Sequence, residues 1–248
     1  NVTDATTQAD HEANISAALL NIASATNEES FNYNDADERT QYSETGSPVV
    51  NYNYDVGHII SSDGTSSYSH HLDGTLSTGR GLDFELDALS RIVEVKRGTS
   101  SICKITYDAF GRPLSIKDGS RPEKIFNYFA SAVHAEKSNN IATKHISMHP
   151  NSGVPLAYHT ETDRINPIYD SRYNLRSLVD SSGKIVETYK YSSFGKPQIF
   201  DENNNPIAKS SFGVDPIFGG QLFLKETELY LSTKRFMDPS TGLFLAAD

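Results

Sequence analysis

The chain contains no tryptophan and only one cysteine, Cys103, among its 248 residues. A single cysteine excludes an internal disulfide and a zinc site built from several cysteines. Because Cys103 lies in a strand-like run, we interpret it as a small buried apolar side chain. Long apolar runs are also missing: none approaches the ~20 residues that a membrane-spanning helix needs. The first residues lack the basic start and apolar core of a signal peptide, so we expect neither feature in this chain.

Positive charge is scarce as well. The chain has 22 Lys and Arg against 32 Asp and Glu, which gives a formal net charge of −10 and a pI near 5.2. An acidic surface argues against a nucleic-acid partner, because phosphate backbones are bound by clustered lysines and arginines. Aromatic residues are plentiful by contrast, with 13 Tyr and 12 Phe. Together with many Ser, Thr, Asn and Gly, they favour an all-β fold with many turns.

The usual signatures of catalysis and of cofactor binding are missing. His70 and His71 are adjacent, so in a strand they point to opposite faces and make a poor chelating pair. No serine lies in a nucleophile-elbow pattern, and Gly79-Arg80-Gly81 is too short for a phosphate-binding loop. We therefore expect no metal and no cofactor. Four more histidines lack the helical spacing of a zinc protease: His134, His145, His149 and His159.

The N-terminal residues differ in pattern from everything that follows. Ile15, Ala18, Leu19 and Ile22 recur at i, i+3, i+4 and i+7, which predicts an amphipathic helix over residues 7–24. Such a helix covers an edge or an end of a sheet, binds a partner, for example as a plug, or is a chain end that is ordered only in part.

From residue 31 onward the sequence contains a repeat. An aromatic or apolar residue, often followed by Asp or Asn, recurs about every 21 residues. The fullest copy begins at Tyr107-Asp108 and continues through Gly111 and Arg112 to a short apolar run. The unit starts are Tyr33, Tyr54, Leu86, Tyr107, Tyr128, Tyr169, Tyr191 and Phe212.

Later copies replace parts of this unit. The copy that begins at Tyr191 keeps the glycine, as Gly195. The copy that begins at Tyr169-Asp170 has Tyr173-Asn174 where the glycine is expected. Asparagine is the next residue most tolerant of positive φ, so we expect Asn174 to supply the left-handed backbone of that turn.

Two stretches break the period. The spacing is longer between Tyr54 and Leu86, and no clear unit start is found between Tyr128 and Tyr169. Within the second stretch, residues 130–135 are compatible with a short helix or with a bulged strand. Each stretch is either a loop with a binding role or tolerated drift of the repeat.

One unit has the content of a β-hairpin. A strand ends at the Tyr-Asp pair, a glycine turn follows, and a second strand returns. Because a hairpin of this size cannot bury a face alone, the hairpins must stack side by side into one long sheet. We predict that the tyrosines at unit starts stack across adjacent strands: Tyr54, Tyr107, Tyr169 and Tyr191. Strong turn signals support the hairpins: Asp63-Gly64, Asp73-Gly74, Asp118-Gly119 and Ser182-Gly183.

The last part of the chain reads as turn, strand, turn, strand. Asp215-Pro216 opens one turn, and Asp238-Pro239 followed by Gly242 forms another. Proline presets φ, glycine supplies positive φ, and aspartate can cap the backbone. The flanking runs are aromatic and aliphatic, as strands are. We interpret Asp215 and Asp238 as turn residues.

The Tyr-Asp-x-x-Gly units, followed by the Arg-x-x-Asp-Pro-x-x-Gly motif of Arg235 to Gly242, resemble the Rhs/YD-repeat family. This family includes bacterial Rhs proteins, the C components of Tc toxins and the animal teneurins. The resemblance covers residues 31–248 and implies an all-β fold, with YD-repeat hairpins stacked into a curved, spiral antiparallel sheet, a section of a cocoon-like shell. It divides the chain into an N-terminal helical segment (1–30), a YD-repeat sheet (31–190) and an RHS-repeat-associated core signature (191–248).

The resemblance also implies a function. The chain is expected to be a structural shell segment of a polymorphic toxin, which encapsulates and delivers a C-terminal toxin domain. Some bacterial members cut themselves with paired aspartates that follow the Arg235 to Gly242 motif. Two close carboxylates share a proton, so that one acts as acid and the other as base. By resemblance, Asp248 is a catalytic residue, one half of an incomplete aspartate pair, and the parent is a self-cleaving aspartyl peptidase.

We expect no activity from this chain alone, because the later aspartate segment that carries the scissile bond in the family is absent from it. Both of its ends also look like cuts through a longer polypeptide. Its expected partners are the remainder of its parent chain, a toxin domain fused after residue 248, and other components of a shell or delivery system, without nucleic acid. The parent is expected to be secreted or displayed at the cell surface. The alternative function is an extracellular adhesion or surface-interaction module of the teneurin type.

Overall fold

The computed structural model describes residues 28–129, 132–138, 141–149, 154–232 and 235–245. Within these ranges the regular elements are strands, and no helix occurs. The predicted all-β fold is confirmed, whereas the helix predicted over 7–24 lies outside the described residues. The chain divides into two compact units, one up to Ser67 and one from Tyr68 onward.

The first unit holds two small antiparallel sheets. Arg39 is buried, with its guanidinium 4.4 Å from the ring centre of Tyr52. The backbone carbonyl of Arg39 accepts a hydrogen bond from the Tyr54 hydroxyl at 3.1 Å, so this predicted unit start fastens one sheet to the other. The sheets are formed by β1 (Glu29–Tyr33), β2 (Arg39–Glu44) and β3 (Val50–Asn51), and by β4 (Asn53–Asp55) and β5 (Ile59–Ser62).

The second unit is built on one antiparallel sheet of 15 strands, in which every strand pairs with its neighbours in the chain. This order is what stacked hairpins produce, and it confirms the predicted long sheet. The strands are β6 (Tyr68–His70), β7 (Leu76–Gly79), β8 (Leu82–Leu86), β9 (Ile92–Arg97), β10 (Ser100–Tyr107), β11 (Pro113–Asp118), β12 (Lys124–Phe129), β13 (Ala132–Ser138), β14 (Ile141–Met148), β15 (Pro155–His159), β16 (Arg164–Tyr169), β17 (Leu175–Val179), β18 (Ile185–Tyr191), β19 (Pro197–Asp201) and β20 (Pro206–Ile207).

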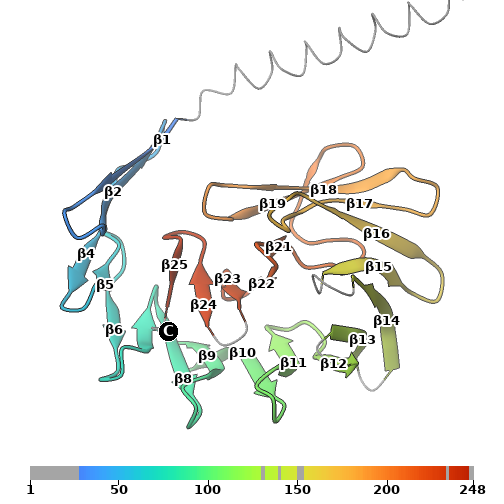
Figure 1. Cartoon of the computed structure of the whole chain (residues 1–248), viewed down its shortest axis with the longest axis horizontal. Helices are drawn as coiled ribbons and strands as arrows, with labels where there is room; N and C mark the ends of the chain where they lie inside the picture. Colours follow the sequence, from blue (N-terminus) through green and yellow to red (C-terminus); the bar gives the residue numbers. More distant parts are fainter. Residues whose placement is uncertain (1–27, 130–131, 139–140, 150–153, 233–234, 246–248) are drawn as a thin grey trace, which may run out of the picture. The chain divides into compact units, whose positions relative to one another are not determined.

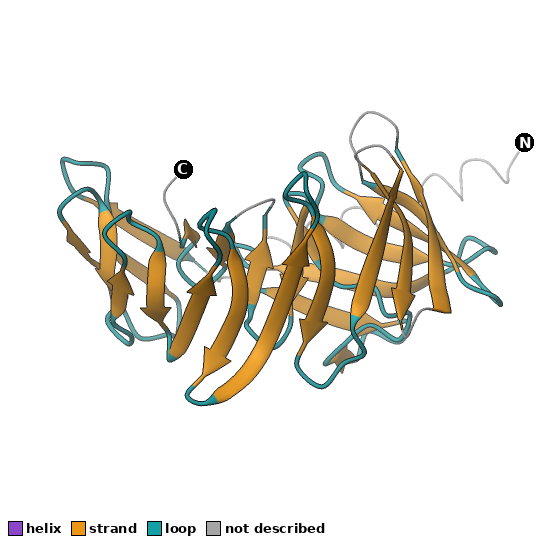
Figure 2. Ribbon diagram, turned by 90° about the horizontal axis from the view of Figure 1, so that it is seen from below, coloured by secondary structure: helices purple, strands orange, loops and turns teal. Residues whose placement is uncertain are grey.

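A second meander of five strands follows, and the long sheet bends around it (Figures 1 and 2). The C-terminal segment, defined here as residues 208–245, therefore lies on the concave side of the long sheet. Its apolar residues Val214 and Ile217 join a buried cluster with Leu175, Leu178 and Tyr189 of the long sheet. We call this 15-stranded sheet, β6 to β20, the wall. The five strands are β21 (Ile217–Phe218), β22 (Gln221–Leu224), β23 (Leu229–Leu231), β24 (Phe236–Asp238) and β25 (Leu243–Phe244).

The turn that begins each YD unit is closed by its aspartate. Asp108 Oδ1 accepts hydrogen bonds from the backbone N–H groups of Phe110 and Arg112, both at 2.9 Å. Asp108 Oδ2 accepts from Arg112 Nε at 2.7 Å. Burial raises the pKa of Asp108, but the hydrogen bonds from Arg112 and Phe110 outweigh it and hold the pKa below its usual value. Gly111 has φ of +79°, which glycine adopts without strain.

The arginine of one unit contacts the tyrosine of the next. The Arg112 guanidinium lies 4.1 Å from the ring centre of Tyr128, and the Arg91 guanidinium lies 4.5 Å from that of Tyr107. The Tyr107 hydroxyl also donates to the backbone carbonyl of Ile92 at 2.9 Å. We expected tyrosines to stack on one another, but at these positions a cation–π contact links successive units. In each turn the aspartate accepts a hydrogen bond from the arginine, as Asp108 does from Arg112, and so orients the guanidinium for the cation–π contact.

The copy at Tyr169 keeps the turn with different residues. Asp170 Oδ1 accepts from the backbone N–H groups of Arg172 and Asn174 at 2.9 and 3.0 Å. The Asn174 side-chain amide donates to Asp170 Oδ2 at 2.9 Å, so Asn174 takes the place of the arginine. Positive φ falls on Tyr173, at +60°, and the expectation that Asn174 supplies it is wrong. The turn fixes which position is left-handed, whatever residue stands there.

The stretch without a visible unit start contains one in the structure. The His149 backbone N–H donates to the Val154 carbonyl at 2.8 Å, a closure one residue longer than the bond from the Asp108 N–H to the Arg112 carbonyl. Met148 ends β14 where a tyrosine is expected, which is why the repeat escaped notice. Of the two forms considered for 130–135, the described residues 132–135 form part of β13 and pair with β12 through a register shift after Asn127.

Replacing Tyr107 with alanine is expected to destabilise the chain by about 3 kcal/mol, because it removes a large half-buried ring and the partner of Arg91. Tyr107→Phe keeps the ring and loses only the hydroxyl bond, which costs about 1 kcal/mol. Phe110→Ala is the control, since that ring is 83 % exposed. Denaturant unfolding gives the free energy of unfolding of each variant, which should be lowest for Tyr107→Ala and highest for Phe110→Ala. Equal stability of Tyr107→Ala and wild type would show that the contact between successive YD repeats does not stabilise the fold.

Candidate functional site

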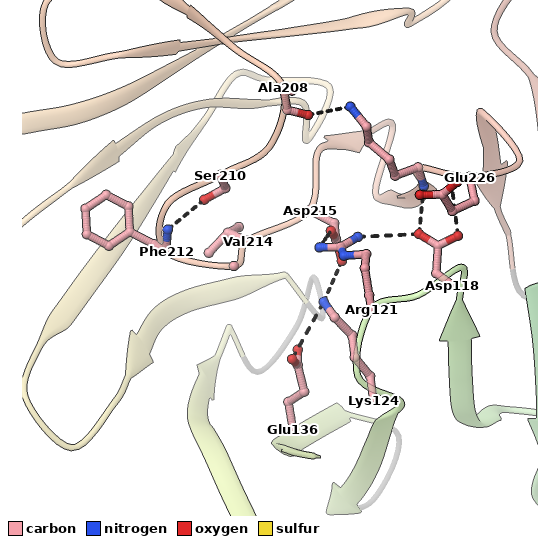
Figure 3. Close-up of polar contacts among 12 residues, drawn as sticks. Asp118, Arg121, Lys124, Glu136, Ala208, Ser210, Phe212, Val214, Asp215 and Glu226 are labelled. Atoms are coloured by element: carbon pink, nitrogen blue, oxygen red, sulfur yellow. Dashed lines mark hydrogen bonds and ion pairs between the residues drawn. The ribbon is translucent and has the colours of Figure 1, made fainter. Parts of the chain in front are cut away.

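The C-terminal segment is fastened to the wall by a buried aspartate. The side chain of Asp215 is only 8 % exposed, and each of its oxygens meets a cation (Figure 3). Arg121 Nη2 lies 2.8 Å from Asp215 Oδ1, and Lys124 Nζ lies 2.5 Å from Oδ2. Burial alone would raise the pKa of Asp215, but Lys124 and Arg121 outweigh burial and lower the pKa below its usual value.

A second aspartate continues the same network. Arg121 Nη1 lies 3.4 Å from Asp118 Oδ2, so one guanidinium bridges Asp118 and Asp215. The Asp118 carboxylate also accepts the backbone N–H groups of Lys225 and Glu226 at 3.0 and 3.2 Å. These two residues form the turn between β22 and β23, which Asp118 therefore ties to the end of β11. Burial is the dominant effect on Asp118 and raises its pKa.

The two lysines of the network share a glutamate. Lys124 Nζ and Lys144 Nζ each lie 3.6 Å from Glu136 Oε1. Lys144 Nζ also donates to the backbone carbonyl of Gly213 in the C-terminal segment. Burial raises the cost of the charged ammonium and lowers the pKa of Lys144. In Lys124, burial acts in the same direction, but Asp215 and Glu136 outweigh it and raise the pKa.

A buried glutamate holds the start of the C-terminal segment. Glu187 on β18 is 1 % exposed. Its Oε1 accepts the Ser211 backbone N–H at 2.6 Å, and its Oε2 accepts the Tyr189 hydroxyl at 2.8 Å. A buried carboxylate is costly unless it is hydrogen-bonded, and here both of its oxygens are. The bonds place the chain entering the concave side directly over β18.

The YD turn that begins at Tyr191 packs against the five-stranded sheet. The Tyr191 ring lies 5.4 Å from that of Phe218, and the Tyr230 hydroxyl donates to the Gly195 carbonyl at 2.7 Å. A Cβ at Gly195 would lie 2.6 Å from the Phe218 ring. Two reasons therefore require glycine at this position: the lack of space for a Cβ, and the φ of +92°, which glycine adopts without strain.

The Arg-x-x-Asp-Pro-x-x-Gly motif forms a buried turn. Asp238 is fully buried, and its Oδ1 accepts from Arg80 Nη1 at 3.0 Å and from the Ser240 backbone N–H at 2.8 Å. Asp238 therefore closes its own turn, as predicted, and also pairs with an arginine from the turn between β7 and β8. Pro239 is buried beside it.

The other two members of the motif have packing roles. The Arg235 guanidinium lies 4.1 Å from the ring centre of Phe244. The Gly242 backbone N–H donates to the Asp238 carbonyl at 2.7 Å with φ of +71° at the glycine, and a Cβ at Gly242 would overlap the ring of Phe194. The motif thus positions its strands against the YD turn that contains Phe194.

Asp248, the predicted catalytic residue, lies outside the described residues, so its role remains a proposal. The described chain reaches Leu245, which is 3 % exposed and whose carbonyl accepts the Leu76 backbone N–H of β7 at 3.2 Å. Asp118 and Asp215 are bridged through Arg121 and do not form a proton-sharing pair. Among the residues that the structure describes, no group of three His, Cys, Asp or Glu side chains is arranged to hold a metal ion.

Sequence reasoning identified Asp215 as a turn residue and missed its ion pairs. Its partners Arg121 and Lys124 stand 94 and 91 residues earlier in the chain. Glu187, Glu136 and the lysines around them were not singled out either. The available signal was weak: a charged residue at an apolar position of a strand, as in Ile185–Tyr191, where Glu187 and Tyr189 alternate with exposed or half-buried residues.

Several known proteins are similar to this chain in sequence or in fold. The curated relatives include the tRNA3(Ser)-specific nuclease WapA of Bacillus spizizenii and the tRNA nuclease WapA of Bacillus subtilis, each 22 % identical over 216 residues. The matched region is 84 % of this chain and 9 % of either relative, so the chain spans about a tenth of their length.

Solved structures share the fold. The crystal structure of TcdB2-TccC3 matches with a TM-score of 0.64 at 14 % identity, over 89 % of this chain and 12 % of that one. The structure of the Photorhabdus luminescens Tc holotoxin pore, which carries a TccC3 mutation, matches with a TM-score of 0.63 at 13 % identity over the same shares. These likenesses show a common architecture.

The part of the chain that the structure describes contains no helix long and apolar enough to cross a bilayer. The family model described as "Teneurin YD-shell" matches residues 1–248, which is the whole chain. The 15-stranded meander, the aspartate-closed YD turns and the C-terminal meander on the concave side agree with that match and with the predicted Rhs/YD-repeat family. The chain belongs to the Teneurin YD-shell family.

Proposed function

We propose that this chain is a wall segment of a toxin shell, whose longer parent encloses and delivers a toxin domain fused downstream and cuts itself at the core. The parent is secreted or displayed at the cell surface. Its partners are the rest of its own chain, the fused toxin and other components of the shell or of its delivery system. The divisions at residues 30 and 190 are part of this proposal.

One observation carries the proposal: the C-terminal segment is bound to the concave side of the wall. Ion pairs of Asp215, backbone bonds to Asp118 and the Arg80–Asp238 pair hold it there. Leu245 is buried against β7, so a polypeptide that continues from it starts from that side. A domain fused at this point begins its path within the curve of the sheet.

The relatives support a parent of the toxin type. Those with curated names are nucleases, and the structural neighbours are components of a Tc toxin. In both cases this chain corresponds to a small share of a much longer polypeptide. A wall segment of a large shell has that relation to its parent.

The self-cleavage part of the proposal is tested with the parent polypeptide extended at least a hundred residues beyond Asp248. We expect the wild type to be cut downstream of the core and Asp248→Asn to remain at full mass, because an amide cannot act as acid or base in a proton-sharing pair. Intact-mass spectrometry reads the result. Asp83→Asn, an exposed change on β8, is the control and should cut normally. An uncut wild type would remove the peptidase from the proposal.

Enclosure is tested separately on the same parent. A downstream domain inside the shell should resist added protease while the wall is intact and become sensitive when Asp215→Asn loosens the C-terminal segment. A downstream domain that is digested at once in the wild type would contradict enclosure. The adhesion alternative would then be tested by binding of the fluorescently labelled parent to cell surfaces.

A further inference from the structure

A pocket of about 460 Å³ lies between the C-terminal segment and the last strands of the long sheet. Its volume falls within the range of small-molecule sites, about 300–1,000 Å³. The walls come from three parts of the chain: β19 and β20 with the residues after them, the turn between β22 and β23, and the Pro239-Ser240 turn. The pocket borders ion-paired residues: Arg80, Arg121, Asp215 and Glu228 are part of its lining.

The charge of this pocket is opposite to that of the chain. Five cationic residues and two carboxylates line it, a balance of +3, in a chain whose formal net charge is −10. Both arginines are already neutralised: Arg80 pairs with Asp238 and Glu228, and Arg121 bridges two aspartates. The excess positive charge therefore belongs to the lysines.

Three lysines supply that excess, and each comes from a different segment. Lys196 precedes β19, Lys209 follows β20, and Lys225 follows β22. Lys225 Nζ donates to the neutral Ala208 carbonyl. Within the described ranges none of the three pairs with a carboxylate, whereas Lys96, Lys104, Lys124, Lys144 and Lys184 do. Lysines that line one concave surface and are not paired with a carboxylate focus a positive potential there.

The remaining lining is apolar. The pocket is bordered by Ile199, Phe200 and Ile207 of the last two strands and by Val214 and Phe223. Ile199 and Val214 belong to the buried core beneath the last strands, and Ile207 is half-buried. A ligand that uses both parts of the lining has a compact anionic group for the lysines and a flat apolar ring for the strand residues. We propose that the pocket binds a phosphorylated small molecule of nucleotide size, with its phosphates on Lys196, Lys209 and Lys225 and its ring over the β19–β20 residues.

Calorimetric titration of the 248-residue chain with ATP, tripolyphosphate and adenosine tests this assignment. We expect saturable binding of ATP, weaker binding of tripolyphosphate, and weaker binding still of adenosine. Lys196→Gln with Lys209→Gln should raise the Kd for ATP by about tenfold per lysine, which is the effect of losing one charge-assisted hydrogen bond. Both lysines are exposed, so the variant should keep the wild-type melting temperature.

The matched control is Lys104→Gln with Lys184→Gln, which removes two exposed ammonium groups outside the pocket. This variant should bind ATP as the wild type does. Absence of ATP binding up to about 1 mM, or equal weakening in both double variants, would overturn the proposal. Tripolyphosphate that binds as tightly as ATP would overturn the nucleotide assignment, as would a glutamate-rich peptide that binds more tightly. None of these results depends on whether the parent encloses a toxin.

Discussion

Asp215→Asn is expected to destabilise the chain by about 3–5 kcal/mol, the usual cost of removing one partner from a buried ion pair. The amide keeps the shape of the side chain but leaves Arg121 and Lys124 facing a neutral group in a buried position. Both cations lie on the wall, and Asp215 lies in the C-terminal segment. The loss therefore acts on the contact between the two sheets. Urea unfolding followed by circular dichroism measures it.

Asp83→Asn provides the comparison for this change. It is the same substitution on an exposed position of β8, and it should change the free energy of unfolding by less than about 0.5 kcal/mol. Similar stabilities for the two variants would show that the Asp215 ion pairs contribute no more than a surface charge. The double variant Asp215→Asn with Lys124→Met should recover part of the loss, because it removes an uncompensated buried charge.

The same ion pairs predict a pH dependence. The pKa of Asp215 is lowered in the folded chain, so its contribution is fully present above the pKa of the unfolded carboxyl, about 3.9. It is lost as the pH falls through the lower folded value. Asp118 acts in the opposite direction, since burial raises its pKa. The difference in free energy of unfolding between wild type and Asp215→Asn reports on Asp215 alone, and it should become smaller below about pH 4. A difference that widens on acidification would contradict the assignment.

Gly242→Ala is expected to cost about 2–4 kcal/mol, because two penalties add. The backbone at this glycine is left-handed, with φ of +71°. The new Cβ would also overlap the Phe194 ring, so the YD turn that holds Phe194 must move away from the Asp238 turn. Thermal unfolding of the purified variant measures the sum.

A second glycine separates the two penalties. Gly81 has nearly the same φ, +70°, and a Cβ there would meet no heavy atom within 4 Å. Gly81→Ala should therefore show the backbone penalty alone, about 1–2 kcal/mol. The excess in Gly242→Ala is the cost of packing against Phe194. If both variants lost the same stability, the close approach of the two turns would have no energetic effect.

The repeat and its turns were predictable because they depend on neighbours in the chain. Asp108 binds backbone groups two and four residues later, so one short motif contains the whole turn. The unit at Met148-His149 escaped prediction because its backbone closure survives without the tyrosine and the aspartate. Asn174 was misassigned for a related reason: turn geometry, rather than residue preference, selects the position with positive φ.

The class of fold, the stacking of hairpins into one long sheet, and the family could all be predicted from the sequence. These follow from hydrogen bonds and side-chain alternation that repeat at a short, fixed spacing. The contacts of the C-terminal segment with the long sheet could not be predicted, because they depend on how that sheet bends. Bending the sheet brings Arg121 and Lys124 to Asp215, Arg80 to Asp238, and three lysines to one pocket. Ion pairs between residues so far apart in the chain have no local pattern, because the curvature of the wall alone sets which charges meet.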